Sequence, residues 1–245
     1  ADGVGCWLLV YVDDLLAASS SLEMLKDLHE LLQNAFELRE ITPVQKYLGL
    51  EIVRDRSVRK LWLNQSAYVD KLCGRFVDEE HVGRSIDAYT ELSFDDEEYQ
   101  ADQHWKELDR CIDYMVNTRD FALEFGGGPD TLHLVGYADS VDAGDQQTPS
   151  STNGYVFVLG GAAVSWASHR IKCMTLSSTE SGYITATEAG KEARRLRFLL
   201  AKFRLLDAGV PTVIHVDNSS AIAVAKGLGL KGSLKHMERR YIWLQ

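Results

Sequence analysis

A pair of adjacent carboxylates, Asp13 and Asp14, interrupts the apolar run from Trp7 to Ala18 in this 245-residue chain. Two charges among so many apolar side chains cannot both be buried without a counter-charge, because desolvation costs several kcal/mol for each ion. A divalent cation supplies that charge, and carboxylate oxygens are the ligands that Mg²⁺ prefers. The alternative is an ordinary surface turn, although such a turn has little need of apolar flanks on both sides.

A second group of acids is spread along the C-terminal half. Asp139 and Asp217 each end a predicted strand, and Glu238 lies on the last predicted helix. Acids at strand ends can converge at one edge of a sheet, where they could hold two metal ions about 4 Å apart. One ion would activate water and the other would stabilise the leaving oxygen of a phosphodiester. Any one of these acids alone would more often be a turn or capping residue, so the argument depends on the strand-end placement of two of them.

Hydrophobic periodicity predicts the elements that would position Asp13 and Asp14. The apolar run reads as two short strands that meet at the acidic pair, because both halves are rich in Val, Leu and Tyr. The pattern that follows predicts, in order, a helix from Leu22 to Phe36 capped within Ser19 to Ser21, a hairpin with strands at Tyr47 to Val53 and Lys60 to Leu63, and a short helix at Gln65 to Phe76.

The middle of the chain predicts a break between two halves. An acidic segment with few aliphatic residues begins at Asp78 and is expected to be a solvated linker. A helix resumes at His104 to Thr118, and the glycines and proline of residues 126–129 end it and mark a domain boundary.

Beyond that boundary the pattern predicts three strands, a long helix, a short strand and a short helix. Their expected bounds are Leu132 to Ala138, Gly154 to Leu159, Ala163 to Ser168, Ser178 to Leu206, Val213 to Val216 and Asn218 to Lys226, with a helical pattern again at Lys235 to Gln245. This order describes a mixed sheet with helices packed on it, in the α/β (α+β) class. We expect this third part to fold alone and the first part to be weakly ordered.

The net charge of −10 conceals an uneven distribution. Between Asp78 and Asp109 twelve acidic residues stand against two basic ones, whereas Lys191 to Gln245 holds eleven basic residues and four acidic ones. A basic C-terminal quarter is compatible with a polyanionic partner in spite of the acidic total.

Other features narrow the class of protein. The four cysteines lie far apart without a CxxC pair, which suggests neither a disulfide framework nor a zinc site. The longest apolar run, Cys6 to Val12, is too short to span a bilayer, and no signal sequence opens the chain. We therefore expect an intracellular protein with no membrane role. Because an apolar strand follows Ala1 almost at once, we also expect a fragment of a longer protein.

Several stretches resemble the reverse transcriptase and RNase H domain of copia-type retrotransposons. YVDDLLAAS at Tyr11 to Ser19 is similar to the catalytic palm hairpin, and KYLGLEIVRD at Lys46 to Asp55 and LNQSAYVDKL at Leu63 to Leu72 are similar to the segments from palm to thumb. HWKELDRCIDYMVNTRDFALEF at His104 to Phe125 resembles the connecting helix. Five further stretches look like the RNase H domain, in the family's order: GYADSVDAGD, SSTNGYVFVLGGAAVSW, LSSTESGY, VDNSSAIAVAK and KHMERRY, which begin at residues 136, 150, 176, 216 and 235.

The resemblance implies a polyprotein fragment in three parts. Residues 1–77 would be a truncated palm and thumb, residues 78–130 the acidic linker and connection helix, and residues 131–245 an RNase H-like domain. The family's activities are RNA-directed DNA synthesis and cleavage of RNA in RNA–DNA hybrids, with Mg²⁺ or Mn²⁺ as cofactor. An RNA–DNA hybrid or other nucleic acid, and the missing N-terminal part of the polyprotein, are the implied partners, in a cytoplasmic virus-like particle or the nucleus.

The resemblance also places the family's functional residues on this chain. Polymerase metal ligands fall on Asp13 and Asp14, and RNase H ligands fall on Asp139, Asp217 and Glu238. Phosphate contacts to a hybrid fall on the residues Lys191, Arg194, Arg195, Arg197, Asn218 and Lys235. The alternative for the basic helix is a solvated charged face.

Three departures from the family pattern put catalysis in question. The first catalytic Asp of the polymerase should lie well upstream of Tyr11, which only ten residues precede, so we expect no polymerase activity. The family's LSSTEAEY reads LSSTESGY, so that the metal-binding Glu corresponds to Gly182; in the alternative register Glu180 is the ligand. The family's final Asp reads Glu238, whose extra methylene can misplace a ligand. Two hypotheses result, an RNase H-bearing reverse transcriptase fragment and a catalytically inactive nucleic-acid-binding module or element remnant.

Overall fold

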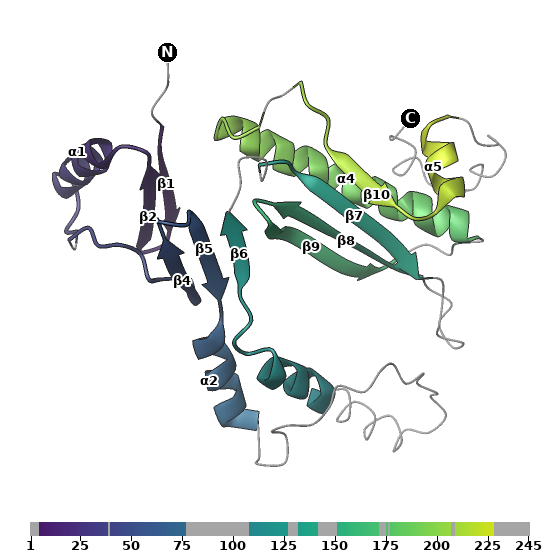
Figure 1. Cartoon of the computed structure of the whole chain (residues 1–245), viewed down its shortest axis with the longest axis horizontal. Helices are drawn as coiled ribbons and strands as arrows, with labels where there is room; N and C mark the ends of the chain where they lie inside the picture. Colours follow the sequence, from purple (N-terminus) through teal and green to yellow (C-terminus); the bar gives the residue numbers. More distant parts are fainter. Residues whose placement is uncertain are drawn as a thin grey trace.

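Residues 5–38, 40–76, 108–126, 132–141, 151–171, 175, 177–206 and 209–227 are described by the computed structural model. Their strands form three sheets that follow one another along an elongated molecule (Figure 1). The fold is mixed α and β, as the sequence predicts.

The first sheet is the two-stranded hairpin predicted around the acidic pair. β1 (Cys6–Tyr11) and β2 (Asp14–Ser19) pair antiparallel, with Tyr11 opposite Asp14 across the turn. Helix α1 (Leu22–Gln33) lies against β2 and is shorter than its apolar pattern. Its N-cap is Ser21, whose Oγ accepts a hydrogen bond from the Met24 N–H at 3.4 Å.

The second sheet has four antiparallel strands in the order β3-β4-β5-β6. They are β3 (Lys46–Tyr47), β4 (Leu50–Asp55), β5 (Lys60–Asn64) and β6 (Leu123–Gly126). The single strand predicted at Tyr47 to Val53 is wrong in one respect. Leu48 and Gly49 both adopt positive φ, 49° and 80°, so the chain reverses there and Tyr47 pairs with Leu50.

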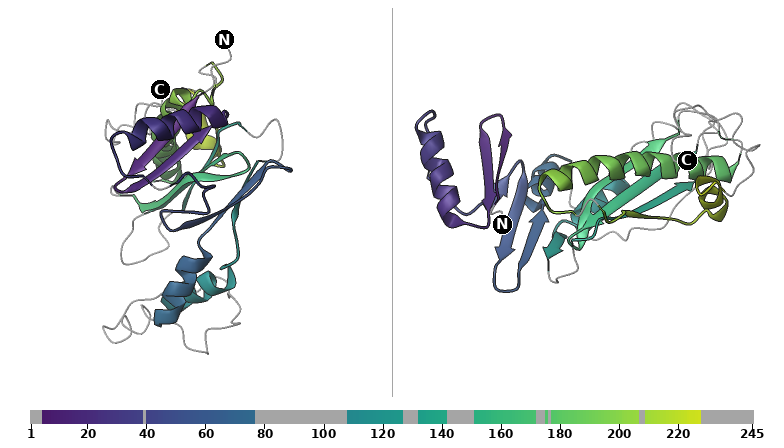
Figure 2. Two further views of the ribbon diagram at one scale, coloured as in Figure 1. Left: turned by 90° about the vertical axis from the view of Figure 1, so that its left-hand side faces the viewer. Right: turned by 90° about the horizontal axis from the view of Figure 1, so that it is seen from above.

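Strand β6 was not predicted, because four residues carry little periodicity and their partner β5 lies about sixty residues earlier. Between them, α2 (Ser66–Phe76) and the described part of a helix at 108–117 lie beside each other at one end of this sheet (Figures 1 and 2). Arg119 joins the two helices through Asp70, with Nε 2.6 Å from Oδ1. The acidic segment expected to be a linker lies outside the described residues.

The third sheet has the order β10-β7-β8-β9. Strands β7 (Val135–Val141), β8 (Thr152–Leu159) and β9 (Ala162–Arg170) are antiparallel, and β10 (Val213–Val216) runs parallel to β7. Helix α4 (Ser178–Lys202) covers one face of the sheet, and α5 (Ser219–Ala225) follows β10 (Figure 2). The predicted order of these six elements is confirmed. None of the described helices is apolar over a length that would cross a membrane.

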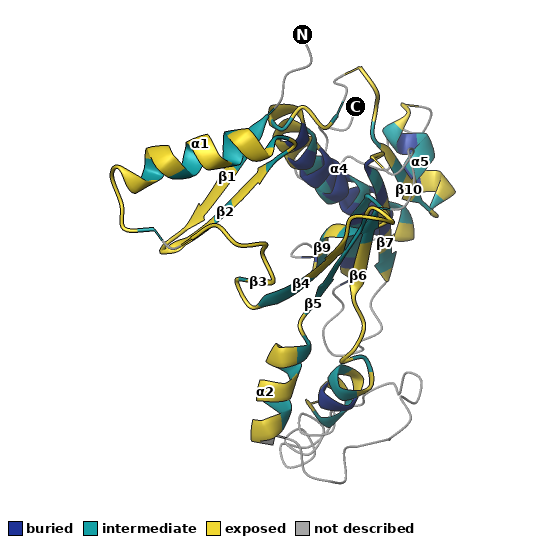
Figure 3. Ribbon diagram, turned by 60° about the vertical axis from the view of Figure 1, so that its left-hand side comes forward, coloured by how far each residue is buried: buried dark blue, intermediate teal, exposed yellow. Residues whose placement is uncertain are grey.

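The main core lies between this sheet and α4. Phe157 is fully buried and packs with Ala138 and with residues of α4 that recur every three or four positions, namely Ala189, Ala193, Leu196 and Leu200. Among the described residues 5–38 and 40–75, none is buried (Figure 3). Apart from Ile112 and Asp113, the buried residues therefore belong to the C-terminal half.

Glycines join the second and third sheets. The N–H of Gly126, at the end of β6, donates to the carbonyl of Gly160 in the β8–β9 turn at 2.7 Å. Gly126 has a φ of 104°, and a β-carbon there would lie 2.1 Å from the carbonyl oxygen of Arg59. The glycine run predicted to interrupt the chain thus begins inside a strand, where only glycine allows this contact.

Candidate functional site

The register of the third sheet brings two of the predicted acids together. Ala138 of β7 lies opposite Val216 of the parallel strand β10, so that Asp139 and Asp217 each follow a paired position. Neighbouring strands are about 4.8 Å apart, so the two residues lie on adjacent strands just beyond the paired segment of β7 and β10. The prediction that Asp139 ends its strand is wrong, because β7 continues to Val141 and Asp139 pairs with Gly154 of β8. Both acids are exposed, and Oδ1 of Asp139 accepts a hydrogen bond from the Ser140 N–H at 2.6 Å.

The first turns of α4 approach the same end of β7 and β10. The Oγ atoms of Ser181 and Ser140 lie 3.3 Å apart, which ties α4 to the residue after Asp139. A β-carbon on Gly182 would lie 3.0 Å from Nδ2 and 3.2 Å from Cβ of Asn218, the residue after Asp217. Position 182 therefore faces the end of β10. Glu180 is buried at 8% exposure in the first turn of α4.

Asn218 connects α4 to α5. Its Oδ1 accepts a hydrogen bond from the Ala221 N–H at 2.9 Å and caps α5, while its Nδ2 donates to the carbonyl of Ser178 at 2.9 Å. Both ends of this amide are thus engaged within the protein. The resemblance implies that Asn218 contacts nucleic acid. Its hydrogen bonds within the protein do not require such a ligand.

The described residues do not fit a two-metal centre. They contain no group of three or more His, Cys, Asp or Glu side chains that could hold a metal ion. Asp139 and Asp217 are two carboxylates on adjacent strands, and Gly182, which the resemblance aligns with a third ligand, is packed against the Asn218 amide. Glu238 and Lys235 lie outside the described residues, so their predicted roles stay predictions.

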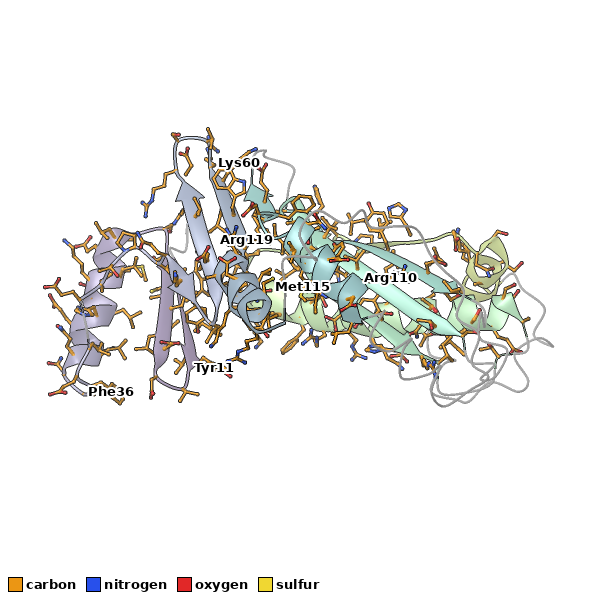
Figure 4. The ribbon with its side chains drawn as sticks, turned by 90° about the horizontal axis from the view of Figure 1, so that it is seen from below. Tyr11, Phe36, Lys60, Arg110, Met115 and Arg119 are labelled. Carbon is orange, nitrogen blue, oxygen red and sulfur yellow. The ribbon has the colours of Figure 1, made fainter. Side chains whose placement is uncertain are left out.

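The acidic pair of the first hairpin lies at an exposed turn. Val12 and Asp13 form the turn, and Val12 has a φ of 50°, which is unfavourable for a β-branched residue. Asp13 and Asp14 are exposed, and so are the apolar flanks, with Val10 at 59% and Val12 at 83%. Figure 4 shows Tyr11 beside this tip. The sequence predicts that apolar side chains surround Asp13 and Asp14. Among the described residues no such packing is present.

Three of the four predicted phosphate-binding cations of α4 have partners within the chain. Lys191 binds Glu188 at 2.7 Å, and Arg195 binds Glu192 through Nε at 2.8 Å. The Arg197 guanidinium donates to the Val210 carbonyl and the Thr212 hydroxyl, which fastens the loop before β10. Arg194 is exposed and forms no ion pair with a described residue. The spacing of three residues between each acid and its base was visible in the sequence.

Glu192, in the middle of this helix, is buried at 9% exposure. Its carboxylate accepts hydrogen bonds from Arg195 and, at 2.6 Å, from Ser165 Oγ of β9. These bonds, those from Arg195 first, hold the pKa of Glu192 below its ordinary value of 4.5 against the opposing effect of burial. Glu192 therefore anchors α4 to the edge strand of the sheet.

One basic surface was missed by the sequence analysis. Arg54, Arg56 and Arg59 surround the turn between β4 and β5 and line a cavity there. The signal was available, because three arginines fall within six residues of a polar turn.

Comparisons with known proteins find similarity to transposon polyproteins. Residues 2–84 match the reverse transcriptase (RNA-dependent DNA polymerase) family. Over 97% of its length the chain is 29% identical to the retrovirus-related Pol polyprotein from transposon TNT 1-94 of Nicotiana tabacum. Over 98% it is 27% identical to that from transposon RE2 of Arabidopsis thaliana. The chain spans 21% and 19% of these two polyproteins.

A shorter match has higher identity. Over 90 residues, 37% of this chain, the sequence is 43% identical to the secreted RxLR effector protein 161 of Plasmopara viticola, of which the match covers 63%. No solved structure matches the chain at a significant level.

Proposed function

We propose that residues 131–245 are an RNase H-like module that binds nucleic acid without hydrolysing RNA. The similarity of the chain to a reverse transcriptase family and to transposon Pol polyproteins supports this proposal. RNA–DNA hybrids are the expected ligand, because such a hybrid is the substrate of the chemistry from which the module descends. Similarity to polyproteins of this kind supports nucleic acid as the partner class.

The observation that carries the proposal is the contact between Gly182 and Asn218. In the register that aligns the metal-binding Glu with Gly182, the resemblance implies a carboxylate at position 182, beside Asp139 and Asp217; in the alternative register Glu180 is that ligand. In this chain position 182 has no side chain, and the space that a β-carbon would occupy is bordered at 3.0 to 3.2 Å by Asn218 and Ala221. Two exposed carboxylates alone hold a divalent cation weakly, since Mg²⁺ catalysis needs closely positioned ligands.

Similar reasoning applies to the polymerase segment, which we propose does not extend a primer by itself. The likeness to reverse transcriptases is in keeping with divalent-metal use in general. Asp13 and Asp14 nevertheless stand at an exposed turn, and the described residues place no third metal-binding side chain beside them. This segment is proposed to contribute binding surface rather than synthesis.

The test measures binding and cleavage on the same sample. The full chain is titrated into a labelled RNA–DNA hybrid and followed by fluorescence anisotropy, and the RNA strand is then examined on a gel after incubation with Mg²⁺ or Mn²⁺. We expect saturable, salt-dependent binding and intact RNA. Absence of binding, or RNA cleavage that Asp139→Asn abolishes, contradicts the proposal.

A matched pair of variants locates the binding surface. Arg194→Ala removes the exposed cation of α4 and should lower the slope of log affinity against log salt by about 0.9. Lys26→Ala removes an exposed charge from α1 and should leave that slope unchanged. Equal effects of the two substitutions would show that α4 is not the contact.

A further inference from the structure

An open cavity of about 480 Å³ lies at the turn of the β4–β5 hairpin, where β6 joins the sheet. Three arginines, Arg54, Arg56 and Arg59, contribute to its wall, and the side chains of Leu61 and Phe125 contribute apolar surface. All three arginines are exposed, and none forms an ion pair with a described residue. The cavity therefore concentrates positive charge that the described protein does not neutralise.

Strand pairing explains why the apolar surface lies beside Arg54. Arg54 is opposite Leu61, and Leu61 is opposite Phe125, so that the three side chains form one row across β4, β5 and β6 on the same face. Arg56 and Arg59 come from the turn that closes this row. Arg59 has a φ of 53° and its carbonyl is held against Gly126, which fixes the backbone of the turn.

The acids of this region belong to the opposite face. Asp55 is opposite Lys60, and Trp62 is opposite Glu124, so these four side chains share the other face of the hairpin. Glu124 accepts hydrogen bonds from Lys60 Nζ and, at 2.8 Å, from Trp62 Nε1. Asp55 is bound to Ser57, whose N–H and hydroxyl donate to its Oδ1 at 2.8 and 2.6 Å.

Lys60 consequently differs from the arginines, although it also borders the cavity. Its ammonium is engaged by Glu124, whereas the guanidinium groups have no anionic partner among the described residues. Figure 4 shows Lys60 near the turn of this hairpin, away from Tyr11 and the acidic tip of the first hairpin. The hairpin thus separates a neutralised face from a cationic one.

We propose that Arg54, Arg56 and Arg59 bind the phosphates of a nucleic-acid strand. Guanidinium groups recognise phosphate oxygens in bidentate fashion, and several on a short, backbone-restrained turn can contact successive phosphates. This inference rests on the proposed nucleic-acid-binding function and adds to it a contact that is independent of α4. The apolar row provides a surface along which a sugar or base can lie.

The test compares two triple variants of the full chain. Arg54→Ala/Arg56→Ala/Arg59→Gly removes the three cations, with glycine chosen to suit the positive φ of residue 59. Lys26→Ala/Lys71→Ala/Arg75→Ala removes the same charge from exposed positions of α1 and α2. A labelled single-stranded DNA and a labelled RNA–DNA hybrid are the probes, and circular dichroism verifies that both variants remain folded.

We expect the arginine variant to bind single-stranded DNA about tenfold more weakly and to lower the salt slope by about 2, against a small change for the control. If the wild type binds and the two triple variants weaken binding equally, the three arginines are not the contact, and the proposed function remains intact. Absence of binding by the wild type overturns both. Displacement of the strand by millimolar inorganic phosphate at matched ionic strength would indicate a small-anion site and contradict the assignment to a strand.

A third variant separates geometry from charge. Arg54→Lys/Arg56→Lys/Arg59→Lys keeps the three charges and loses the planar fork. We expect it to retain the salt slope and recover part of the affinity. A lysine variant as weak as the alanine and glycine variant would show that the loss came from a disturbed turn and would overturn the phosphate contact.

Discussion

The side chain of Asn218 lies so close to Gly182 that a β-carbon on residue 182 would come within 3.0 Å of the Asn218 amide nitrogen. That nitrogen is itself fixed, because it donates to the carbonyl of Ser178 one turn earlier in α4. The contact allows α5 to approach α4 and fills the region beside Asp217 with an amide. It is the structural basis of the proposal that the C-terminal module does not hydrolyse RNA.

The tight contact predicts that Gly182→Ala destabilises the fold, although alanine normally stabilises a helix by about 1 kcal/mol over glycine. The new methyl group must displace the Asn218 amide or the β-carbon of Ala221. We expect a net loss of about 1 kcal/mol in the free energy of unfolding, measured by urea denaturation.

Gly74 of α2 is the matched control, since nothing lies within 4 Å of its would-be β-carbon. Gly74→Ala should leave stability unchanged or raise it by up to about 1 kcal/mol. Equal effects at the two positions would refute the close packing at Gly182.

The lowered pKa of Glu192 predicts that the free energy of unfolding depends on pH. Its pKa is lowered in the folded protein, so the ionised carboxylate stabilises the fold above its ordinary pKa of 4.5, and that contribution is lost as the pH falls through the folded value. Glu192→Gln should lower the free energy of unfolding at pH 7 by about 1 kcal/mol, because Arg195 is exposed and solvent screens its charge. Thermal unfolding should show that the difference in stability between the wild type and Glu192→Gln is smaller below pH 4.5 than at pH 7. Glu188→Gln, in a more exposed pair, should change less.

Gly126 predicts a larger effect on the second sheet. Gly126→Ala forces a residue with a β-carbon into a φ of 104° and against the Arg59 carbonyl. We expect a loss of about 3 kcal/mol or more from strain and displaced pairing of β6. Gly49→Ala meets only the strain of a positive φ with open space around it, and should cost about 1 kcal/mol. Urea denaturation of the two variants that shows equal losses would argue against the contact with Arg59.

The distribution of buried residues predicts the outcome of limited proteolysis. Buried positions gather in the third sheet and α4, whereas no described residue of 5–38 or 40–75 is buried. Brief trypsin digestion followed by mass spectrometry should leave a resistant fragment that contains β7 to α5. Survival of the N-terminal half as the resistant core would refute this distribution.

Much of the fold followed from local patterns in the sequence. The apolar patterns of β7, β8, β9 and α4 predicted these elements and their order, and the serines of Ser19 to Ser21 predicted a cap for α1, which the structure assigns to Ser21. The elements that the sequence did not predict depend on contacts between distant residues or on an unusual backbone conformation. Strand β6 depends on a partner about sixty residues away, and the turn at Leu48 and Gly49 carries a leucine where positive φ is uncommon.

The site was less predictable than the fold. The strand-end placement predicted for Asp139 is wrong, because β7 continues to Val141, whereas Asp217 does follow the last residue of β10. The register of β7 and β10 still puts the two acids on adjacent strands. The pairing of Arg195 with Glu192 follows a spacing of three residues on one helix and could have been predicted. The partners of Arg197 depend on how α4 meets the loop before β10, which no local pattern specifies. The cationic face of the β4–β5 hairpin required the register of three strands.

The most direct test of the central claim is cleavage of a labelled RNA–DNA hybrid in Mg²⁺ and in Mn²⁺ by four forms of the full chain. They are the wild type, Asp139→Asn, Gly182→Glu and Gly182→Glu/Asn218→Ser, in which serine still caps α5 and leaves room for the carboxylate. We predict that the wild type is inert and that the double variant gains cleavage, more than Gly182→Glu alone. Cleavage by the wild type that Asp139→Asn abolishes would contradict the account, because the site would then be complete without an acid at position 182.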